Sequence, residues 1–252
     1  MENVSILGCG WLGKPLAINL INNGYKVKGS TTSNHKIDDF KSLKIIPFIV
    51  DILLDNDVDN FLDSDILIIA ITSKNVIDFK RLISKIEKSP IKKVLFISST
   101  SVYPSLNKEM REEDKTVNSP LVEIENLFLK NVNFKTTIIR FAGLYGYDRQ
   151  PGNWFKDRKI PHPKGFVNMI HQDDCILVIK KIIAEDVFGE VFNVCSNHHP
   201  TREEFYTNAR KVLQKEAPVF DNSMPLKFKI INSEKVQRVL KYTFIHDNLL
   251  SI

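Results

Sequence analysis

The residues that most constrain the fold are three glycines near the N-terminus, Gly8, Gly10 and Gly13, spaced as G-x-G-x-x-G. The apolar residues Val4, Ile6 and Leu7 precede them, and apolar residues at helical spacing follow. A strand that turns through such glycines into a helix is the arrangement that binds the pyrophosphate of a dinucleotide. The first glycine permits the tight turn, the second lets a phosphate approach the backbone, and the third lets the helix pack against the strand. The sequence therefore predicts a Rossmann-type strand–turn–helix unit.

The start of this helix is the expected phosphate site. Its first N–H groups have no partner within the helix and lie at the positive end of the helix dipole. We therefore expect the cofactor to contact Gly8, Gly10, Trp11, Leu12 and Gly13. Gly24, which follows two asparagines, is expected to end the helix in the left-handed conformation that favours glycine.

Further strand patterns follow along the chain. Apolar residues alternate with lysine at 25–29, and mainly apolar runs occupy residues 45–50, 65–70 and 93–98. An amphipathic helical pattern covers residues 76–86. Strands that alternate with helices over short connections indicate an α/β protein with a doubly wound parallel sheet. We expect a single Rossmann-type domain over residues 1–252 that folds as one unit. The segments 146–175 and 200–252 would form a small C-terminal cap on the substrate side.

The residues after the second predicted strand bear on cofactor choice. NAD-preferring Rossmann units carry an acidic residue about 20 positions beyond the glycines, where it binds the ribose hydroxyls. Here Ser30, Thr31 and Thr32 occupy that region, with His35 and Lys36 close behind. Hydroxyl and basic groups suit a 2′-phosphate, so the pattern favours NADP over NAD. The alternative is that these residues merely form a polar turn.

Two other strand ends supply predicted cofactor contacts. Asp51 follows the run 45–50, where a carboxylate could reach the adenine edge or simply cap a turn. Ala70, Ile71 and Thr72 leave the fourth strand and are small or polar enough to line a cofactor.

Four motifs along the chain carry a resemblance to a known family. They are Ser-Ser-Thr-Ser-Val-Tyr at 98–103, Ile-Arg-Phe-Ala-Gly-Leu-Tyr-Gly at 139–146, Val-Asn-Met-Ile-His-Gln-Asp-Asp at 167–174 and Val-Phe-Asn-Val at 191–194. Together with the glycine turn, and in this order, they resemble the extended short-chain dehydrogenase/reductases, the NAD-dependent epimerase/dehydratase family. Phe141 stands where that family usually has proline. The resemblance implies further cofactor contacts at Ser99, Ala142 and Gly143.

One departure from the family concerns its catalytic pair, Tyr-x-x-x-Lys, in which the lysine lowers the pKa of the tyrosine that transfers a proton. None of the six tyrosines is followed four residues later by lysine. Aligning Glu125 with the family's usual glutamate puts Val117 and Leu121 at the catalytic positions. We therefore expect an atypical member that keeps the dinucleotide site and lacks the acid–base pair.

Other residues could still take part in catalysis. Ser99 matches the family's active-site Ser/Thr, and Tyr103 could replace the missing proton donor, although buried tyrosines more commonly serve the core. Arg140 could bind an anionic substrate or form a partly buried salt bridge.

A Pro-, Gly- and aromatic-rich segment, residues 146–168, is expected to form a long loop over the cofactor cleft. Long ordered loops in compact domains tend to be functional. Its candidate substrate contacts are Arg149, Asn153 and Trp154.

Several polar groups have simpler interpretations. His171 beside Asp173 and Asp174 could form a proton relay, but either aspartate is well explained as a helix cap. His198-His199 lacks a second ligand cluster at zinc spacing and is expected in a solvated turn, so no metal is predicted.

Two more polar runs have structural explanations. Residues 112–114, Glu-Glu-Asp, are expected in an exposed loop, and residues 201–204, Thr-Arg-Glu-Glu, form a capping box that opens a helix. Phe228–Ile231 is expected to form an edge strand, and Ser233 to open a short final helix.

Composition excludes several classes of protein. The 252 residues carry a net charge of only +5 without an aromatic-interleaved basic stripe, so we expect no nucleic-acid partner. The three cysteines lack C-x-x-C spacing, and no apolar run is long enough to span a membrane, which predicts a cytoplasmic protein. The predicted function is an NAD(P)-dependent oxidoreductase or epimerase on a small sugar- or nucleotide-like substrate. The alternative is a non-catalytic dinucleotide-binding sensor or scaffold.

Overall fold

The computed structural model of the protein describes residues 2–54, 56–155 and 158–251. Its central feature is a seven-stranded sheet with the strand order β11-β7-β5-β4-β1-β2-β3. The strands are β1 (Asn3–Leu7), β2 (Lys26–Thr31), β3 (Ile46–Ile49), β4 (Ile66–Ile69), β5 (Lys93–Ser99), β7 (Lys135–Phe141) and β11 (Val191–Val194).

The direction of the sheet's winding reverses beside β1. Strands β2 and β3 follow on one side of it, and β4 and β5 on the other, with parallel pairing throughout these five strands. The connecting helices are α1 (Gly13–Asn22), α2 (Ile37–Ser42), α3 (Asp59–Leu62), α4 (Val76–Ile86), α5 (Pro120–Leu129) and α6 (Gln172–Ala184). This is the doubly wound Rossmann arrangement, so the predicted fold class is confirmed.

The chain divides into two compact units, and each is discontinuous in sequence. The first comprises residues 1–98, 118–139 and 179–191, and the second comprises residues 99–117, 140–178 and 192–252. The segments predicted as a cap, 146–175 and 200–252, fall within the second unit, and the cap prediction includes residues 156, 157 and 252, which lie outside the described part of the chain. That the whole chain folds as one domain stays a prediction.

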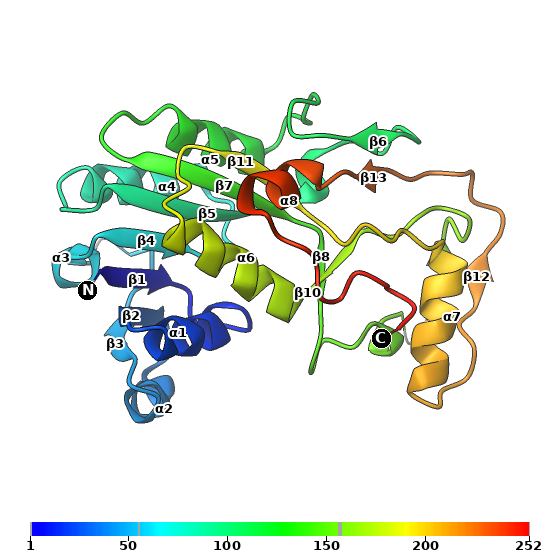
Figure 1. Ribbon diagram of the computed structural model, residues 1–252, viewed down its shortest axis with the longest axis horizontal. Helices are drawn as coiled ribbons and strands as arrows, with labels where there is room; N and C mark the ends of the chain where they lie inside the picture. Colours follow the sequence, from blue (N-terminus) through cyan, green and yellow to red (C-terminus); the bar gives the residue numbers. More distant parts are fainter. Residues whose placement is uncertain (1, 55, 156–157, 252) are drawn as a thin grey trace. The chain divides into compact units, whose positions relative to one another are not determined.

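The first unit is built on strands that are buried on both faces. Every residue of β4 is buried, as its continuous apolar sequence predicts. Figure 1 shows α1 in front of the sheet and α4 and α5 behind it. Between these rear helices and β5, the rings of Phe79, Phe96 and Phe128 pack with centroid distances of 5.1–6.1 Å. Helix α1 ends as expected, because Gly24 has a φ of +88° just after the last turn.

The second unit contains three two-stranded pairs and two further helices. The pairs are β8 (Gly143–Tyr145) with β10 (Met169–His171), β9 (Ile160–Pro161) with β12 (Phe220–Asp221), and β6 (Glu109–Met110) with β13 (Ile230–Ile231); the helices are α7 (Arg202–Val212) and α8 (Glu234–Leu240). The predicted capping box at Thr201 and Glu204 is present, and Ser233 directly precedes α8 as expected. The predicted strand over 228–231 is shorter, since only its last two residues pair.

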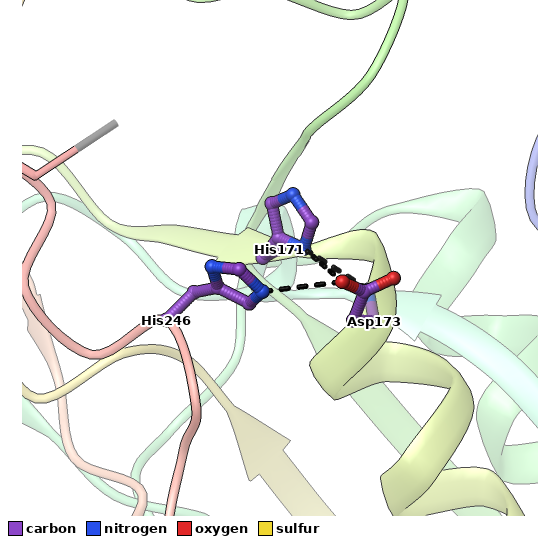
Figure 2. A group of neighbouring side chains, drawn as sticks. All are labelled: His171, Asp173 and His246. Atoms are coloured by element: carbon purple, nitrogen blue, oxygen red, sulfur yellow. Dashed lines mark hydrogen bonds and ion pairs between the residues drawn. The ribbon is translucent and has the colours of Figure 1, made fainter.

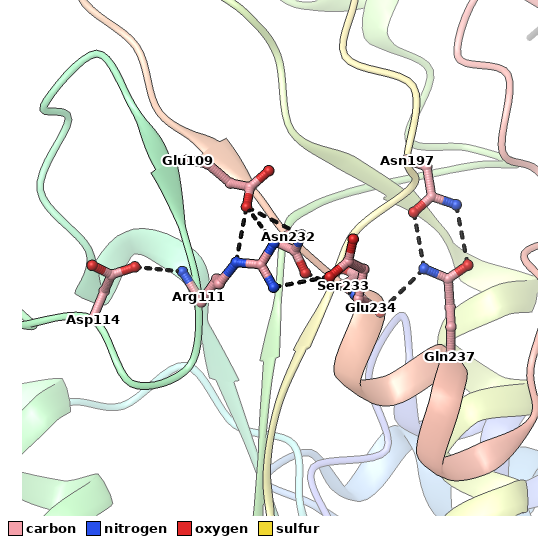
Figure 3. A network of polar contacts seen from close by, with 8 residues as sticks. All are labelled: Glu109, Arg111, Asp114, Asn197, Asn232, Ser233, Glu234 and Gln237. Atoms are coloured by element: carbon pink, nitrogen blue, oxygen red, sulfur yellow. Dashed lines mark hydrogen bonds and ion pairs between the residues drawn. The ribbon is translucent and has the colours of Figure 1, made fainter.

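A polar network holds the β6–β13 pair to the start of α8 (Figure 3). The Arg111 guanidinium lies 2.8 Å from Glu109 and 2.9 Å from Glu234. The Asn232 side chain donates to Glu109 and accepts from the backbone N–H of Glu234. Residues more than 120 positions apart in the sequence are therefore joined within the second unit.

The expectation that Asp173 or Asp174 caps a helix is wrong. Helix α6 begins at Gln172, so Asp173 and Asp174 lie in its first turn and do not cap it. Asp174 instead is fully buried and accepts three hydrogen bonds, from the Tyr242 hydroxyl and from the backbone N–H groups of Ile245 and His246.

The described helices contain none that is both long and apolar enough to cross a lipid bilayer.

Candidate functional site

The three glycines of the first turn differ in what a side chain would meet. Gly8 has a φ of +98°, and an added Cβ would lie 2.7 Å from the Ala70 carbonyl oxygen. At Gly13 an added Cβ would lie 2.2 Å from the carbonyl oxygen of Gly8. At Gly10 it would meet no atom within 4 Å, and this residue is exposed. Gly8 and Gly13 are therefore required by the backbone itself, whereas the open space at Gly10 serves no packing purpose and leaves room for a ligand.

The first turn of α1 is prepared for an anion. Its N-cap residue is Leu12, whose apolar side chain makes no cap hydrogen bond, and the turn contains no acidic residue. Lys14 lies in the same turn, with its Nζ 2.6 Å from Asp39. The N-terminal N–H groups of a helix without a side-chain cap attract an anion, because the helix dipole is positive there. This is the turn at which the sequence predicts the pyrophosphate, and that contact stays a prediction.

The predicted polar run after β2 divides into two parts. The strand continues through Thr31, so Ser30 and Thr31 belong to the sheet. The alternative that all these residues form a polar turn is wrong for these two. The Ser30 hydroxyl accepts from the Gly8 backbone N–H at 2.9 Å, and Thr31 Oγ1 accepts from the Ser33 backbone N–H at 3.1 Å. Thr32 is exposed, as are the nearby basic residues His35 and Lys36.

The other predicted contacts of the first unit lie at neighbouring strand ends. Ala70 follows β4 and lies directly against Gly8, and its backbone N–H donates to the Leu7 carbonyl at 2.8 Å. Ile71 also contacts the Gly8 position, whereas Thr72 is exposed. Asp51 accepts from the backbone N–H of Leu53, the turn-capping arrangement that the sequence left open.

The second unit begins with the residues after β5. Ser99 ends the strand, and its Oγ accepts from the Ser101 backbone N–H at 3.1 Å, which opens the 3₁₀ turn Thr100–Val102. The neighbouring Ser98, in the first unit, donates to Glu125 at 2.5 Å. Glu125 lies in α5 and is buried, which gives the glutamate of the family pattern a structural role.

Tyr103 lies in a buried polar group. Its hydroxyl accepts from Arg140 Nη1 at 2.6 Å and donates to Asn193 Oδ1 at 2.9 Å, and the guanidinium also lies 5.1 Å from its ring centroid. Burial raises the pKa of Tyr103, although the positive charge of Arg140 acts in the opposite direction. A neutral phenol with both hydrogen-bonding positions used is suited to holding Arg140 and Asn193 in place.

The same group corrects one expectation and adds a residue. Glu112 is half-buried and accepts from the Asn193 backbone N–H at 2.8 Å, so the run 112–114 is not wholly an exposed loop. Lys229, which the sequence did not single out, donates to the carbonyl oxygens of Thr100 and Tyr103 at 2.8 and 2.6 Å. Burial lowers the pKa of Lys229. No local pattern could have shown this contact, because the partners are 126 or more residues apart.

The positions aligned with the family's catalytic pair are apolar and packed. Leu121 lies in the first turn of α5 and is buried, and Val117 is half-buried with its backbone N–H donating to the Val102 carbonyl at 2.8 Å.

The remaining predicted contacts belong to the second unit. Ala142 is buried and Gly143, at the start of β8, is exposed. The Asn153 side-chain oxygen accepts from Lys215, and Trp154 packs against an apolar cluster that includes Tyr206. Of the predicted substrate contacts, Arg149 is the most exposed.

Comparisons with known proteins agree with the Rossmann fold. Residues 3–123 match the family model of the NAD binding domain of 6-phosphogluconate dehydrogenase. Protein YeeZ of Escherichia coli strain K12 is 29% identical over 263 residues, covering 97% of this chain and 96% of that protein.

Solved structures extend the likeness over nearly the whole chain. A conserved protein of unknown function from Silicibacter pomeroyi superposes with a TM-score of 0.82 at 16% identity, covering 100% of this chain and 96% of that one. UDP-glucuronic acid 4-epimerase from Bacillus cereus, solved in complex with NAD, superposes with a TM-score of 0.78 at 19% identity, covering 98% and 95%. The chain is therefore a Rossmann-fold protein whose N-terminal half is similar to NAD-binding domains.

Proposed function

We propose that this protein is an atypical member of the NAD-dependent epimerase/dehydratase family that binds NAD(P) at the β1–α1 turn. Its activity would be that of an oxidoreductase or epimerase on a small sugar- or nucleotide-like substrate. The observation that carries the proposal is the open space at Gly10 beside an α1 N-terminus without a side-chain cap. The match of residues 3–123 to an NAD-binding model and the NAD complex of the structurally similar epimerase support it.

The proposed preference for NADP over NAD is based on the residues at the end of β2. Exposed Thr32 precedes the exposed basic residues His35 and Lys36, and no carboxylate stands at this strand end to bind ribose hydroxyls. A 2′-phosphate would gain a hydroxyl donor and nearby positive charge here. NADP is therefore the proposed cofactor in preference to NAD.

The groups that transfer hydride and proton would differ from those of the family's usual site. A bound nicotinamide supplies hydride transfer, and the protein orients the reactants. With Val117 and Leu121 at the positions of the family's tyrosine and lysine, another group must move the proton. Ser99 is the proposed candidate: its Oγ accepts the Ser101 N–H, so its own hydroxyl can donate a hydrogen bond to a substrate oxygen while a water molecule supplies the proton. Tyr103 is proposed to act indirectly, by fixing Arg140.

A second candidate function is a non-catalytic dinucleotide sensor. The packed apolar side chains at positions 117 and 121 favour it, because loss of general acid–base catalysis removes a factor of about 10²–10⁴ in rate. The two functions share the cofactor site and differ only in turnover.

Substitution Gly10→Ala tests the shared site. Because an added Cβ meets no protein atom within 4 Å, the melting temperature should be unchanged. The methyl group would occupy the space proposed for the pyrophosphate, so the Kd for NADPH in a fluorescence titration should rise by about tenfold or more, or about 1.4 kcal/mol. Asn22→Ala, at the other end of α1 and exposed, is the matched control. Equal NADPH affinity in Gly10→Ala and the wild type would contradict the proposal, as would failure of the wild type to bind either NADPH or NADH.

Turnover separates the two candidates. Cofactor absorbance at a fixed NADPH or NADP concentration is followed against a panel of carbonyl compounds and nucleotide sugars. Since an epimerase regenerates its cofactor, the same mixtures are also analysed by chromatography for a new isomer of each sugar. The enzyme hypothesis expects turnover that Ser99→Ala reduces. Cofactor binding without turnover across the panel favours the sensor.

A further inference from the structure

Three side chains of the second unit, none of them a proposed cofactor contact, lie close together (Figure 2). They are His171, at the end of β10, Asp173, in the first turn of α6, and His246, in the segment after α8. Asp173 Oδ2 lies 3.4 Å from Nδ1 of His171 and 3.1 Å from Nε2 of His246. One ligand atom from each residue lies within 4.8 Å of the other two.

We propose that His171, Asp173 and His246 form a binding site for one divalent transition-metal ion of the zinc class, with a coordination position open to the adjoining cavity. Zinc binds histidine nitrogen and carboxylate oxygen at about 2.0–2.2 Å, so neighbouring ligands of a tetrahedral ion are about 3.3 Å apart. The two separations from Asp173, 3.4 and 3.1 Å, agree with that edge length, and the ligand atoms of all three residues lie within 4.8 Å of one another.

The state of the His171 ring agrees with a ligand role. Its Nδ1 accepts a hydrogen bond from the Asp173 backbone N–H at 3.2 Å, so this nitrogen carries no proton. An unprotonated imidazole nitrogen is the form that binds metals, and a bound ion would replace this single hydrogen bond.

Surrounding contacts hold the three ligands in position. The Tyr147 hydroxyl donates to Asp173 Oδ1 at 2.8 Å, which leaves Oδ2 to the imidazoles. Asp174 accepts from the backbone N–H of His246 at 3.0 Å, which fixes the C-terminal segment against α6. Hydrogen bonds of this kind orient ligands in established metal sites.

The group also borders a cavity of 390 Å³ within the second unit. Both histidines line it, together with largely apolar residues such as Tyr145, Pro151 and Ile245. Three protein ligands and an accessible fourth position are typical of zinc sites that bind a water or a small molecule. The ligand class expected there is a small molecule that offers an oxygen donor beside an apolar body.

Cobalt binding tests the site, because Co²⁺ accepts the same ligands as zinc and absorbs visible light. The full-length protein, without a polyhistidine tag and treated with chelator, is titrated with Co²⁺. We expect one ion per chain with visible absorption of a low-coordinate site, and displacement by Zn²⁺. Asp173→Asn and His246→Ala should each weaken binding by about 10-fold or more. Glu216→Gln, which alters an exposed carboxylate away from the three ligands, should bind as the wild type does.

The outcomes decide the proposal independently of dinucleotide binding. If the wild type binds no Co²⁺, or if His246→Ala binds it equally well, the three side chains form only a hydrogen-bonded group and the site is refuted. Since His246 is partly exposed, the variant should keep its far-UV circular dichroism, which shows that lost binding does not reflect unfolding. Acetohydroxamate, a small oxygen-donor probe, should change the cobalt spectrum, and an unchanged spectrum would refute the open coordination position.

Discussion

Ser30 and Thr32 show how a short polar run divides between structural and ligand-binding roles. The Ser30 hydroxyl is buried and accepts a hydrogen bond from the Gly8 backbone N–H, so it helps to hold the glycine turn in place. Thr32 is exposed just beyond the strand. Both are small hydroxyl residues, so their roles could not be distinguished before the fold was known. The difference arises because β2 extends two residues further than its alternating pattern predicts.

Thr32→Asp should reverse the proposed cofactor preference. A carboxylate at the end of β2 repels a 2′-phosphate and can accept hydrogen bonds from ribose hydroxyls. We expect the ratio of NADPH to NADH affinity to fall by about tenfold, which corresponds to about 1.4 kcal/mol. Parallel fluorescence titrations with both cofactors measure the ratio. Thr32→Asn, similar in size and uncharged, is the control, and a ratio unchanged in the aspartate variant would show that the 2′-phosphate is not bound here.

Elements with long, regular patterns were predictable in detail. Helix α4 spans Val76–Ile86 as expected, because its apolar residues repeat at helical spacing and Asn75 caps its first turn. Boundaries were less predictable where a polar residue had two possible roles. Asp174 looked like a helix cap, whereas it binds the backbone of residues 245 and 246. The local sequence contains no sign of a partner more than 70 positions away.

The capping box of α7 provides a test at the scale of a single element. Thr201 Oγ1 accepts from the Glu204 backbone N–H, and Glu204 Oε2 accepts from the Thr201 backbone N–H at 2.8 Å. Thr201→Ala removes the first bond and should lower the free energy of unfolding by about 1 kcal/mol. Urea denaturation measures the change. Thr207→Ala, exposed within the same helix, should be neutral or slightly stabilising, so an equal loss in both variants would show that the cap is not responsible.

At the scale of the whole molecule, the sequence predicted the Rossmann sheet better than the second unit. Repeated strand and helix patterns are local, so the order of elements in the sheet follows from them. The groups Tyr103–Arg140–Asn193 and His171–Asp173–His246 combine segments that are 30 to 90 residues apart. His246 in particular lies in an irregular segment without a motif. Only the folded chain brings such residues together.

The stability of the molecule should depend on His199. The ring contacts the Val167 carbonyl at 3.1 Å, and burial lowers the pKa of His199, contrary to the solvated turn expected for it. Below the unfolded pKa of about 6.5, the unfolded chain binds more protons than the folded chain, so stability falls as the pH falls. His171, also with a lowered pKa, contributes in the same direction.

His199→Asn should therefore lose less stability than the wild type between pH 7.5 and 5.5. Asparagine cannot take up the proton, and its amide N–H, which lies near the position of Nδ1, can still donate to the Val167 carbonyl. Urea unfolding at several pH values measures this difference. If the two proteins lose stability in parallel over that interval, His199 is not the group responsible.

The pairing of β6 with β13 has a consequence for synthesis on the ribosome. Residues 109–111 leave the ribosome about 120 residues before their partners at 230–234. Nascent protein must therefore carry an unpaired strand edge until residues 230–234 emerge, and a product that stalls or terminates before them would keep that edge exposed to other chains.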